Sequence, residues 1–331
     1  MRAVITGTAG FIGSHLAERL VGDGWEVTGL DAFTAYYDPA DKDANLAGLR
    51  EEPRFDLIRA DLVTAPLRRL LAERPLIVHL AAQPGVRGSF GDGFERYVHD
   101  NILATQRLFD AARDAGCPRV VYASSSSVYG DAATYPCVEN STPTMPRSPY
   151  GVTKRTCEKL AEVYRDLGLD AVGLRLFTVY GPRQRPDMAI RRLCEAAVGG
   201  PAFRLNGDGS QIRDFTYIDD AVDAIARSLS ADGPGDVLNI GGDQEATMIE
   251  LIEIIESLAG RAIPVEYAPV QLGDVRRTGG DTSRARDRLG WAPRADLRGG
   301  VRAELDWVSR RRAEASAPPD RQPALAVLKA S

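Results

Sequence analysis

Short apolar runs alternate with amphipathic stretches through the first half of the chain. The apolar runs are rich in β-branched residues, and we place candidate strands at Ala3–Thr6, Glu26–Asp31, Phe55–Arg59, Leu76–Leu80, Arg119–Ser124 and Asp170–Phe177. Stretches between them, such as Ser14–Val21 and Asn101–Ala115, have helical periodicity, and the second stops at Gly116 and Pro118. Strands that alternate with helices form βαβ units, so we predict an α/β fold built on a doubly wound parallel sheet.

The pattern changes after about Tyr180, where loops rich in Gly, Pro and Arg separate short strands and helices such as Met248–Leu258. This predicts a smaller α/β C-terminal lobe that closes over the carboxyl edge of the sheet. We place the first domain at 1–178, with segments near 211–241 as a candidate return to it, and the second lobe at 179–312. The segment 313–331 is predicted to be a mobile tail.

Composition removes several classes of protein. The 331 residues carry 41 Lys and Arg against 46 Asp and Glu, with no long basic run, so nucleic acid is not expected as a partner. No signal peptide and no apolar stretch of about 20 residues is visible, so we expect a cytoplasmic protein without a membrane partner. The four cysteines lack metal-ligand spacing, and we expect packed thiols and no metal.

Three glycines in GTAGFIG, at positions 7, 10 and 13, follow a predicted strand and open a predicted helix. In that context glycines let backbone N–H groups approach a pyrophosphate at the helix N-terminus. Asp31 ends the next predicted strand. A carboxylate at this position can accept hydrogen bonds from the adenosine ribose and repel a 2'-phosphate. The alternative interpretation is that Asp31 only caps a loop. The motif predicts a dinucleotide site for NAD rather than NADP.

Further segments extend this predicted site. Asp61 and Leu62 follow the third strand, where they could contact the edge of the adenine. HLAAQ ends the fourth strand with small residues that let a dinucleotide lie close. We assign no chemical role to His79 of this segment. The predicted cofactor-binding residues are Gly7, Gly10, Phe11, Ile12, Gly13, Asp31, Asp61, Leu62, Leu80, Ala81, Ala82, Gln83, Asn101, Tyr150 and Lys154.

Tyr150 and Lys154, in YGVTK, are spaced to share one face of a helix that begins near Pro149. A neighbouring ammonium lowers the pKa of a phenol toward the range where it works as a base. A serine run after the fifth strand would bring a hydroxyl to the same edge of the sheet. Such a run is also typical of a polar turn. The YxxxK spacing likewise occurs commonly on protein surfaces. These residues are candidates for hydride transfer at a carbinol.

Several segments together resemble the extended short-chain dehydrogenase/reductase family, and in particular its nucleotide-sugar epimerases and dehydratases: TGTAGFIGSH, HLAAQ, YASSSSVYG, SPYGVTK, RDFTYIDDA and DTSRARDRLGWAP. The resemblance implies a Rossmann-type domain with tightly bound NAD, a nucleotide-sugar lobe and a homodimer. Carried over by position, it implies a catalytic set of Ser125, Tyr150 and Lys154.

The resemblance also bears on the subfamily. Sugar 4,6-dehydratases carry an Asp-Glu pair where this chain has Ser126 and Ser127, and UDP-glucuronate decarboxylases carry a Glu at position 127. UDP-galactose 4-epimerases usually carry Asn-Pro in place of Thr178 and Val179, and the chain is more similar to UDP-glucuronate 4-epimerases. We therefore expect NAD-dependent conversion of UDP-glucuronate to UDP-galacturonate through a 4-keto sugar, in which uncharged hydroxyls hold the C6 carboxylate.

The predicted substrate contacts are arginines for phosphate oxygens, hydroxyls for the sugar and a few residues for the nucleotide. They are Arg87, Ser125, Ser126, Ser127, Thr178, Arg185, Met188, Ala189, Phe203, Leu205, Arg213 and Arg276. Arg276, or Arg277, is expected to replace a family arginine at the position of Gln271. Three alternatives stay open: a UDP-glucose/galactose 4-epimerase, a UDP-glucuronate decarboxylase, and a sensor that binds NAD and nucleotide sugar without chemistry.

Overall fold

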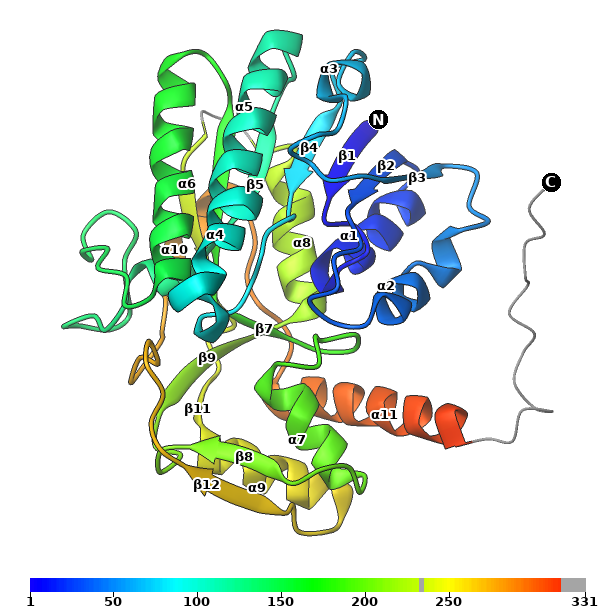
Figure 1. Ribbon diagram of the computed structural model, residues 1–331. Helices are drawn as coiled ribbons and strands as arrows, with labels where there is room; N and C mark the ends of the chain where they lie inside the picture. The colour runs from blue at the N-terminus through cyan, green and yellow to red at the C-terminus, as the bar shows by residue number, and fades with distance from the viewer. Residues whose placement is uncertain (232–234, 317–331) are drawn as a thin grey trace.

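The computed structural model describes residues 1–231 and 235–316 and places them in two lobes (Figure 1). Seven strands from this part of the chain form one parallel sheet in the order β10-β6-β5-β4-β1-β2-β3. Its strands are β1 (Arg2–Thr6), β2 (Glu26–Asp31), β3 (Phe55–Arg59), β4 (Leu76–His79), β5 (Val120–Ser125), β6 (Ala171–Leu176) and β10 (Val237–Ile240). The Rossmann-type doubly wound sheet is confirmed, and its order changes direction between β1 and β4, where ligands bind beyond the carboxyl ends.

Helices cover both faces of this sheet. On one face α1 and α8 pack together with the strands and with Trp291, and on the other α3, α5 and α6 enclose a second apolar core. The helices of this lobe are α1 (Phe11–Gly22), α2 (Pro39–Asn45), α3 (Leu67–Leu70), α4 (Phe94–Tyr97), α5 (Ala104–Ala115), α6 (Pro149–Asp166), α8 (Ile218–Ser228) and α10 (Ser283–Leu289). Short helical turns are η1 (Ala47–Leu49), η2 (Arg87–Ser89), η3 (Gly91–Gly93), η4 (Val98–Leu103, a π-helix) and η5 (Ser126–Val128).

The chain leaves the first sheet after β6, where β7 starts a different sheet. The second lobe contains β7 (Thr178–Tyr180), β8 (Phe203–Asn206), β9 (Ile212–Tyr217), β11 (Glu245–Thr247), β12 (Val265–Ala268), α7 (Ala189–Ala197), α9 (Met248–Ala259) and α11 (Leu297–Ser316). Within the segment 211–241, α8 and β10 pack into the first lobe, whereas β9 pairs with β7 and β11.

Local signals account for several helix ends. The Ser148 hydroxyl accepts a hydrogen bond from the Gly151 N–H (3.1 Å), and Pro149 follows, which starts α6 as predicted. The predicted helix Asn101–Ala115 begins earlier, because α4 and η4 lead into α5 without a break. Residues 313–316 of the predicted tail form the end of α11, and 317–331 lie outside the described residues.

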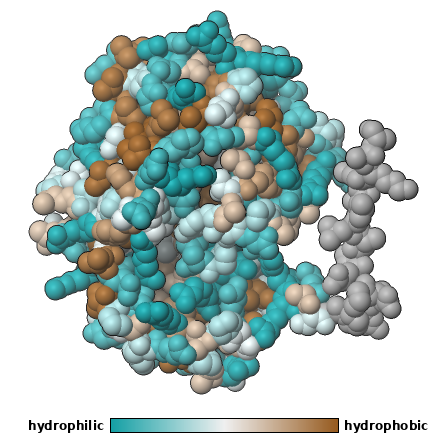
Figure 2. Space-filling model, in the orientation of Figure 1, coloured by the Kyte–Doolittle hydropathy of each residue, from teal (hydrophilic) through white to brown (hydrophobic). Residues whose placement is uncertain are grey.

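The surface facing the viewer of Figure 1 is mixed, with apolar side chains gathered over its upper part (Figure 2). Among the residues that the structure describes, no helix combines the length and apolarity that crossing a membrane requires. The four cysteines are buried and free, in agreement with packed thiols.

Candidate active site

A cavity of about 460 Å³ opens at the carboxyl edge of the sheet and reaches the second lobe. Its wall contains the ends of β1, β2, β4 and β5, the start of α6, and residues of the loops around Arg185 and Asp274. The predicted dinucleotide and sugar segments therefore share one continuous space.

The glycines of GTAGFIG form the floor at one end. Gly7 has a left-handed φ of +73°, and a Cβ there would lie 2.7 Å from the Ala81 nitrogen. A Cβ on Gly13 would lie 2.2 Å from the Gly7 carbonyl oxygen, so a side chain at either position would break the turn. Gly10 precedes α1 without a side-chain cap, which leaves the first-turn N–H groups of Phe11 and Ile12 for a phosphate.

Asp31 is buried at the end of β2 and is held from three directions. Its carboxylate accepts hydrogen bonds from the Ala9 N–H (3.1 Å) and the Phe33 N–H (2.7 Å), and it pairs with the Lys42 ammonium at 3.3 Å. Asp31 and Lys42 both line the cavity. Lys42 has no periodic signal in the sequence, because it comes from the irregular insert after β2.

Asp61, Leu62 and the segment Leu80–Ala82 also line the cavity, whereas two predicted contacts lie behind its wall. The Gln83 N–H donates to Asn101 Oδ1 (2.7 Å), and Asn101 Nδ2 donates to Thr153 Oγ1 (2.9 Å) on α6. Both side chains are buried and neither is among the described residues that face the cavity. Their position corresponds to a brace between the fourth strand and α6 rather than to direct cofactor contact.

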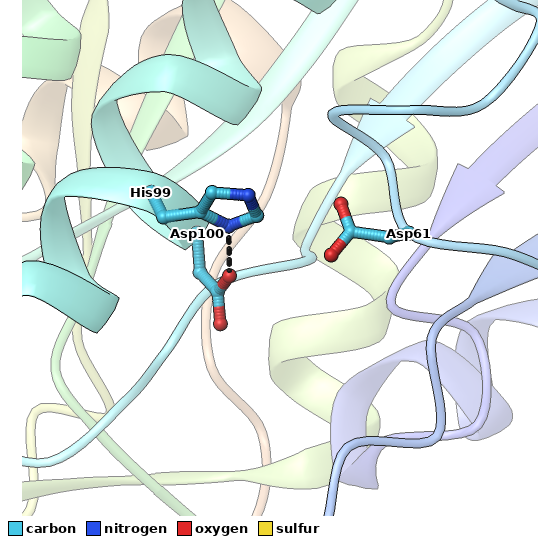
Figure 3. Close-up of side chains that lie close together, drawn as sticks. All are labelled: Asp61, His99 and Asp100. Atoms are coloured by element: carbon cyan, nitrogen blue, oxygen red, sulfur yellow. Dashed lines mark hydrogen bonds and ion pairs between the residues drawn. The ribbon is translucent and has the colours of Figure 1, made fainter.

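Asp61 faces His99 and Asp100 at this end of the cavity (Figure 3). One ligand atom of each residue lies within 4.8 Å of the others, which is the spacing of a potential metal site. Both carboxylates already have partners, however: Asp61 accepts from the Val63 N–H (2.8 Å), and Asp100 pairs with Arg96 and with His99 Nδ1 (2.7 Å). We assign no metal to this group.

The catalytic candidates come together where β5 ends and α6 begins. Lys154 is buried, its ammonium donates to the Ala123 carbonyl oxygen (2.8 Å), and it lies 6.0 Å from the centre of the Tyr150 ring. The Ser125 hydroxyl accepts from the Ser127 N–H (3.1 Å) and lines the same wall as Tyr150. The Tyr97 ring packs edge-on against Tyr150 with 6.2 Å between ring centres, which limits where the phenol can point.

Polar uncharged side chains surround this point. Ser125, Ser126, Ser127 and Thr178 all line the cavity, and Arg185 and Met188 approach it from the loop before α7. Arg185 lies within Coulombic range of the Tyr150 phenol. The structure thus brings the predicted hydroxyls, the phenol and one guanidinium to the same end of the cavity.

The remaining predicted substrate contacts divide into three groups, of which only the first lines the cavity. Arg213 lines the cavity, and its guanidinium donates only to the Ile212 carbonyl oxygen among the described residues, so it is free to bind an anion. Arg87 is exposed and pairs with Asp274 of the cavity wall (3.4 Å), while Ala189 begins α7 and Arg276 is exposed. Phe203 and Leu205 are buried in the core of the second lobe and are not among the described residues that line the cavity, so this placement does not support their predicted contact with uracil.

The fold and the site define a Rossmann-type dinucleotide enzyme with a Ser-Tyr-Lys set. The chain belongs to the NAD dependent epimerase/dehydratase family, which matches residues 3–241. The open first turn of α1, the glycine turn and buried Asp31 fit NAD as its cofactor. With this family match and with relatives and solved neighbours that are 4-epimerases, the chain is an NAD-dependent nucleotide-sugar 4-epimerase.

The similar proteins include both UDP-glucose epimerases and a UDP-glucuronic acid 4-epimerase. The chain is 42% identical to an uncharacterized UDP-glucose epimerase of Bacillus subtilis (strain 168), over 93% of this chain and 98% of that protein. It is 39% identical to the UDP-glucose 4-epimerase of Mycolicibacterium smegmatis, over 93% and 98%. The crystal structure of UDP-glucuronic acid 4-epimerase from Bacillus cereus with UDP-glucuronic acid and NAD is 37% identical, with a TM-score of 0.91 over 94% of this chain and 100% of that one.

Proposed function

We propose that this chain is a UDP-glucuronate 4-epimerase that forms UDP-galacturonate. The observation that carries the proposal is the wall of uncharged hydroxyls, Ser125–Ser127 and Thr178, beside Tyr150. Arg185 supplies a positive charge at the same end, and no carboxylate stands at positions 126 and 127. A C6 carboxylate would meet hydrogen-bond donors there and no acid or base that could drive elimination.

The catalytic step rests on Tyr150, Lys154 and Ser125. NAD, when bound, supplies the oxidising chemistry by accepting and returning a hydride at C4 of the sugar. Tyr150 takes the proton of the C4 hydroxyl, and the Lys154 ammonium, fixed by the Ala123 carbonyl, lies 6.0 Å from the centre of the Tyr150 ring. The Ser125 hydroxyl hydrogen bonds the reacting oxygen, and proton return from Tyr150 after rotation of the 4-keto sugar completes the epimerisation.

In this proposal the hydroxyl wall, Ser125–Ser127 and Thr178, also prevents decarboxylation of the intermediate. The 4-keto form of a uronic acid is a β-keto acid, which loses carbon dioxide when its carboxylate stands perpendicular to the carbonyl plane. Several fixed donors, with Thr178 from β7 and the serines from the end of β5, would hold the carboxylate out of that alignment. The arrangement supports epimerisation over decarboxylation.

A UDP-glucose/galactose 4-epimerase is the second candidate, favoured by the names of two relatives of this chain. It would use the same proton transfer at Tyr150 and differ only in the group at C6. A neutral hydroxymethyl group needs neither a guanidinium nor several donors, which is why Arg185 and Thr178 favour the uronate.

Proton NMR separates these candidates. Purified protein, without added NAD, is incubated with UDP-glucuronate, and the anomeric sugar signals are followed. UDP-galacturonate is the expected product and would also report retained NAD. Formation of a UDP-pentose would assign a decarboxylase. If UDP-glucuronate is not converted but UDP-glucose, tested in a parallel incubation, is, the chain is the second candidate.

A further inference from the structure

Asp187 forms an ion pair with one edge of the Arg185 guanidinium. Arg185 Nε donates to Asp187 Oδ1 (3.0 Å) and Arg185 Nη2 donates to Asp187 Oδ2 (3.1 Å), so the pair is bidentate. Arg185 lines the cavity, whereas Asp187 is exposed and is not among the described residues that line it. The opposite edge of the guanidinium, which includes Nη1, has no hydrogen-bond partner among the described residues.

Tyr36 fixes Asp187 from the other lobe. Its hydroxyl donates to Asp187 Oδ2 (3.2 Å), which links the insert after β2 to the loop before α7 across the mouth of the cavity. The hydroxyl is itself closely packed, because a Cβ on Gly85 would lie 2.7 Å from the Tyr36 oxygen. Both Asp187 oxygens therefore accept hydrogen bonds from Arg185, and Oδ2 also accepts one from Tyr36.

The ionisation of Asp187 is consistent with this arrangement. Partial desolvation of its carboxyl group alone would raise the pKa of Asp187, but the charge and hydrogen bonds of Arg185 hold that pKa below its usual value. The carboxylate is charged at neutral pH and partly offsets the charge of Arg185. Anion binding at the free edge then depends on the direction of its N–H groups more than on net charge.

We propose that Asp187, held by Tyr36, is a positioning residue that presents the free edge of Arg185 to the anionic group of the sugar. Arg185 lies at the Tyr150 end of the cavity, where the reacting sugar and not the diphosphate would lie. A planar carboxylate matches two parallel N–H groups of a fixed guanidinium. Asp187 thereby contributes to the choice of uronate over neutral hexose, an inference that rests on the proposed function.

Binding to NAD-loaded protein tests this positioning without turnover. In a Tyr150→Phe background, calorimetry gives the Kd of UDP-glucuronate, UDP-glucose and UDP. We expect Asp187→Ala to weaken UDP-glucuronate about tenfold to a hundredfold, the range of a charged hydrogen bond, and to leave UDP-glucose and UDP within about twofold. Tyr36→Phe, which keeps the Asp187–Arg185 pair, should weaken UDP-glucuronate by a smaller factor.

A matched control is Asp243→Ala, which removes an equally exposed aspartate from an Arg286 pair away from this cavity. Equal losses for all three nucleotides with Asp187→Ala would show a structural role only, and unchanged or tighter UDP-glucuronate binding would overturn the proposal. Melting temperatures of the variants show whether they fold. The proposed function fails separately, if the wild-type protein does not convert UDP-glucuronate in the NMR experiment.

Discussion

Glu158 and Arg175 form a doubly hydrogen-bonded ion pair directly behind the catalytic residues. Arg175 Nε and Nη2 each donate to one Glu158 oxygen at 2.8 Å, and both side chains are fully buried. The Ser124 hydroxyl donates to the same carboxylate (2.6 Å), so the residue before Ser125 is tied to the helix that carries Lys154.

We expect Glu158→Ala to lower the free energy of unfolding by about 3–5 kcal/mol, because it leaves the Arg175 charge buried and unpaired. Urea unfolding followed by circular dichroism measures the change. Glu162→Ala, which removes an exposed acid of the same helix, should cost less than about 1 kcal/mol. Similar costs for the two variants would mean that water reaches Arg175.

The proposed base predicts a separation of chemistry from binding. Tyr150→Phe should lower the epimerisation rate about 10²–10⁴-fold, since the phenol oxygen is the only proton acceptor assigned to the C4 hydroxyl. The NAD content of the purified variant should stay at the wild-type level, because the glycine turn and Asp31 are untouched. Turnover at the wild-type rate would remove Tyr150 from the mechanism.

Thr178→Val tests the control of decarboxylation. The replacement keeps the shape of the side chain and removes one donor from the hydroxyl wall, so the 4-keto intermediate should lose carbon dioxide more often. We expect a UDP-pentose signal in the NMR experiment that the wild-type protein does not give. Thr64→Val changes an exposed threonine of the first lobe and should leave the product ratio unchanged. If Thr178→Val changes neither uronate turnover nor pentose formation, Thr178 does not hold the carboxylate.

The exposed face of α6 predicts self-association, which the family resemblance also implies. Val152, Val163 and Leu167 are 47%, 55% and 55% exposed, and Val98 and Leu103 are exposed on the neighbouring η4. A charge at Val163 would be costly to bury between two copies. Light scattering should give a dimer for the wild-type chain and a monomer for Val163→Glu, with Val270→Glu as an exposed control in the second lobe. A wild-type monomer would refute this interface.

Local sequence signals were sufficient for the scaffold of the site. β2 and β3 have the predicted ends, and α6 begins at Pro149, because β-branched runs and a serine cap followed by proline act within a few residues. The glycine turn was predictable for the same reason. Positions that depend on one short segment could be read from that segment.

Tertiary placement decided the rest. Tyr36 and Lys42 belong to an irregular insert, and only the folded chain brings them to the cavity. Phe203 and Leu205 share one face of β8, but alternation cannot say whether that face meets the lobe core or a ligand. Gln83 and Asn101 likewise read as cavity residues, although they hydrogen bond to each other behind it.

Glu304 predicts how stability depends on pH. It is fully buried on α11, its Oε2 accepts from the Gly181 N–H (2.9 Å), and its Oε1 has no partner among the described residues. Burial raises the pKa of Glu304 from 4.5 to about 8, so the folded chain keeps this proton while the unfolded chain releases it. The stabilisation is fully present below pH 4.5 and is lost as the pH rises through about 8.

Glu304→Gln removes this titration and keeps an oxygen for the Gly181 N–H. We expect equal stability of variant and wild type near pH 4.5, and a more stable variant at pH 9 by on the order of 5 kcal/mol at most. Asp214, whose pKa burial raises to about 7, titrates in both proteins and cancels in the difference. Urea unfolding across this pH range measures the gap. If the gap does not widen as the pH rises from 4.5 to 9, Glu304 is already ionised in the folded chain, and its carboxylate must find a partner that the present contacts do not include.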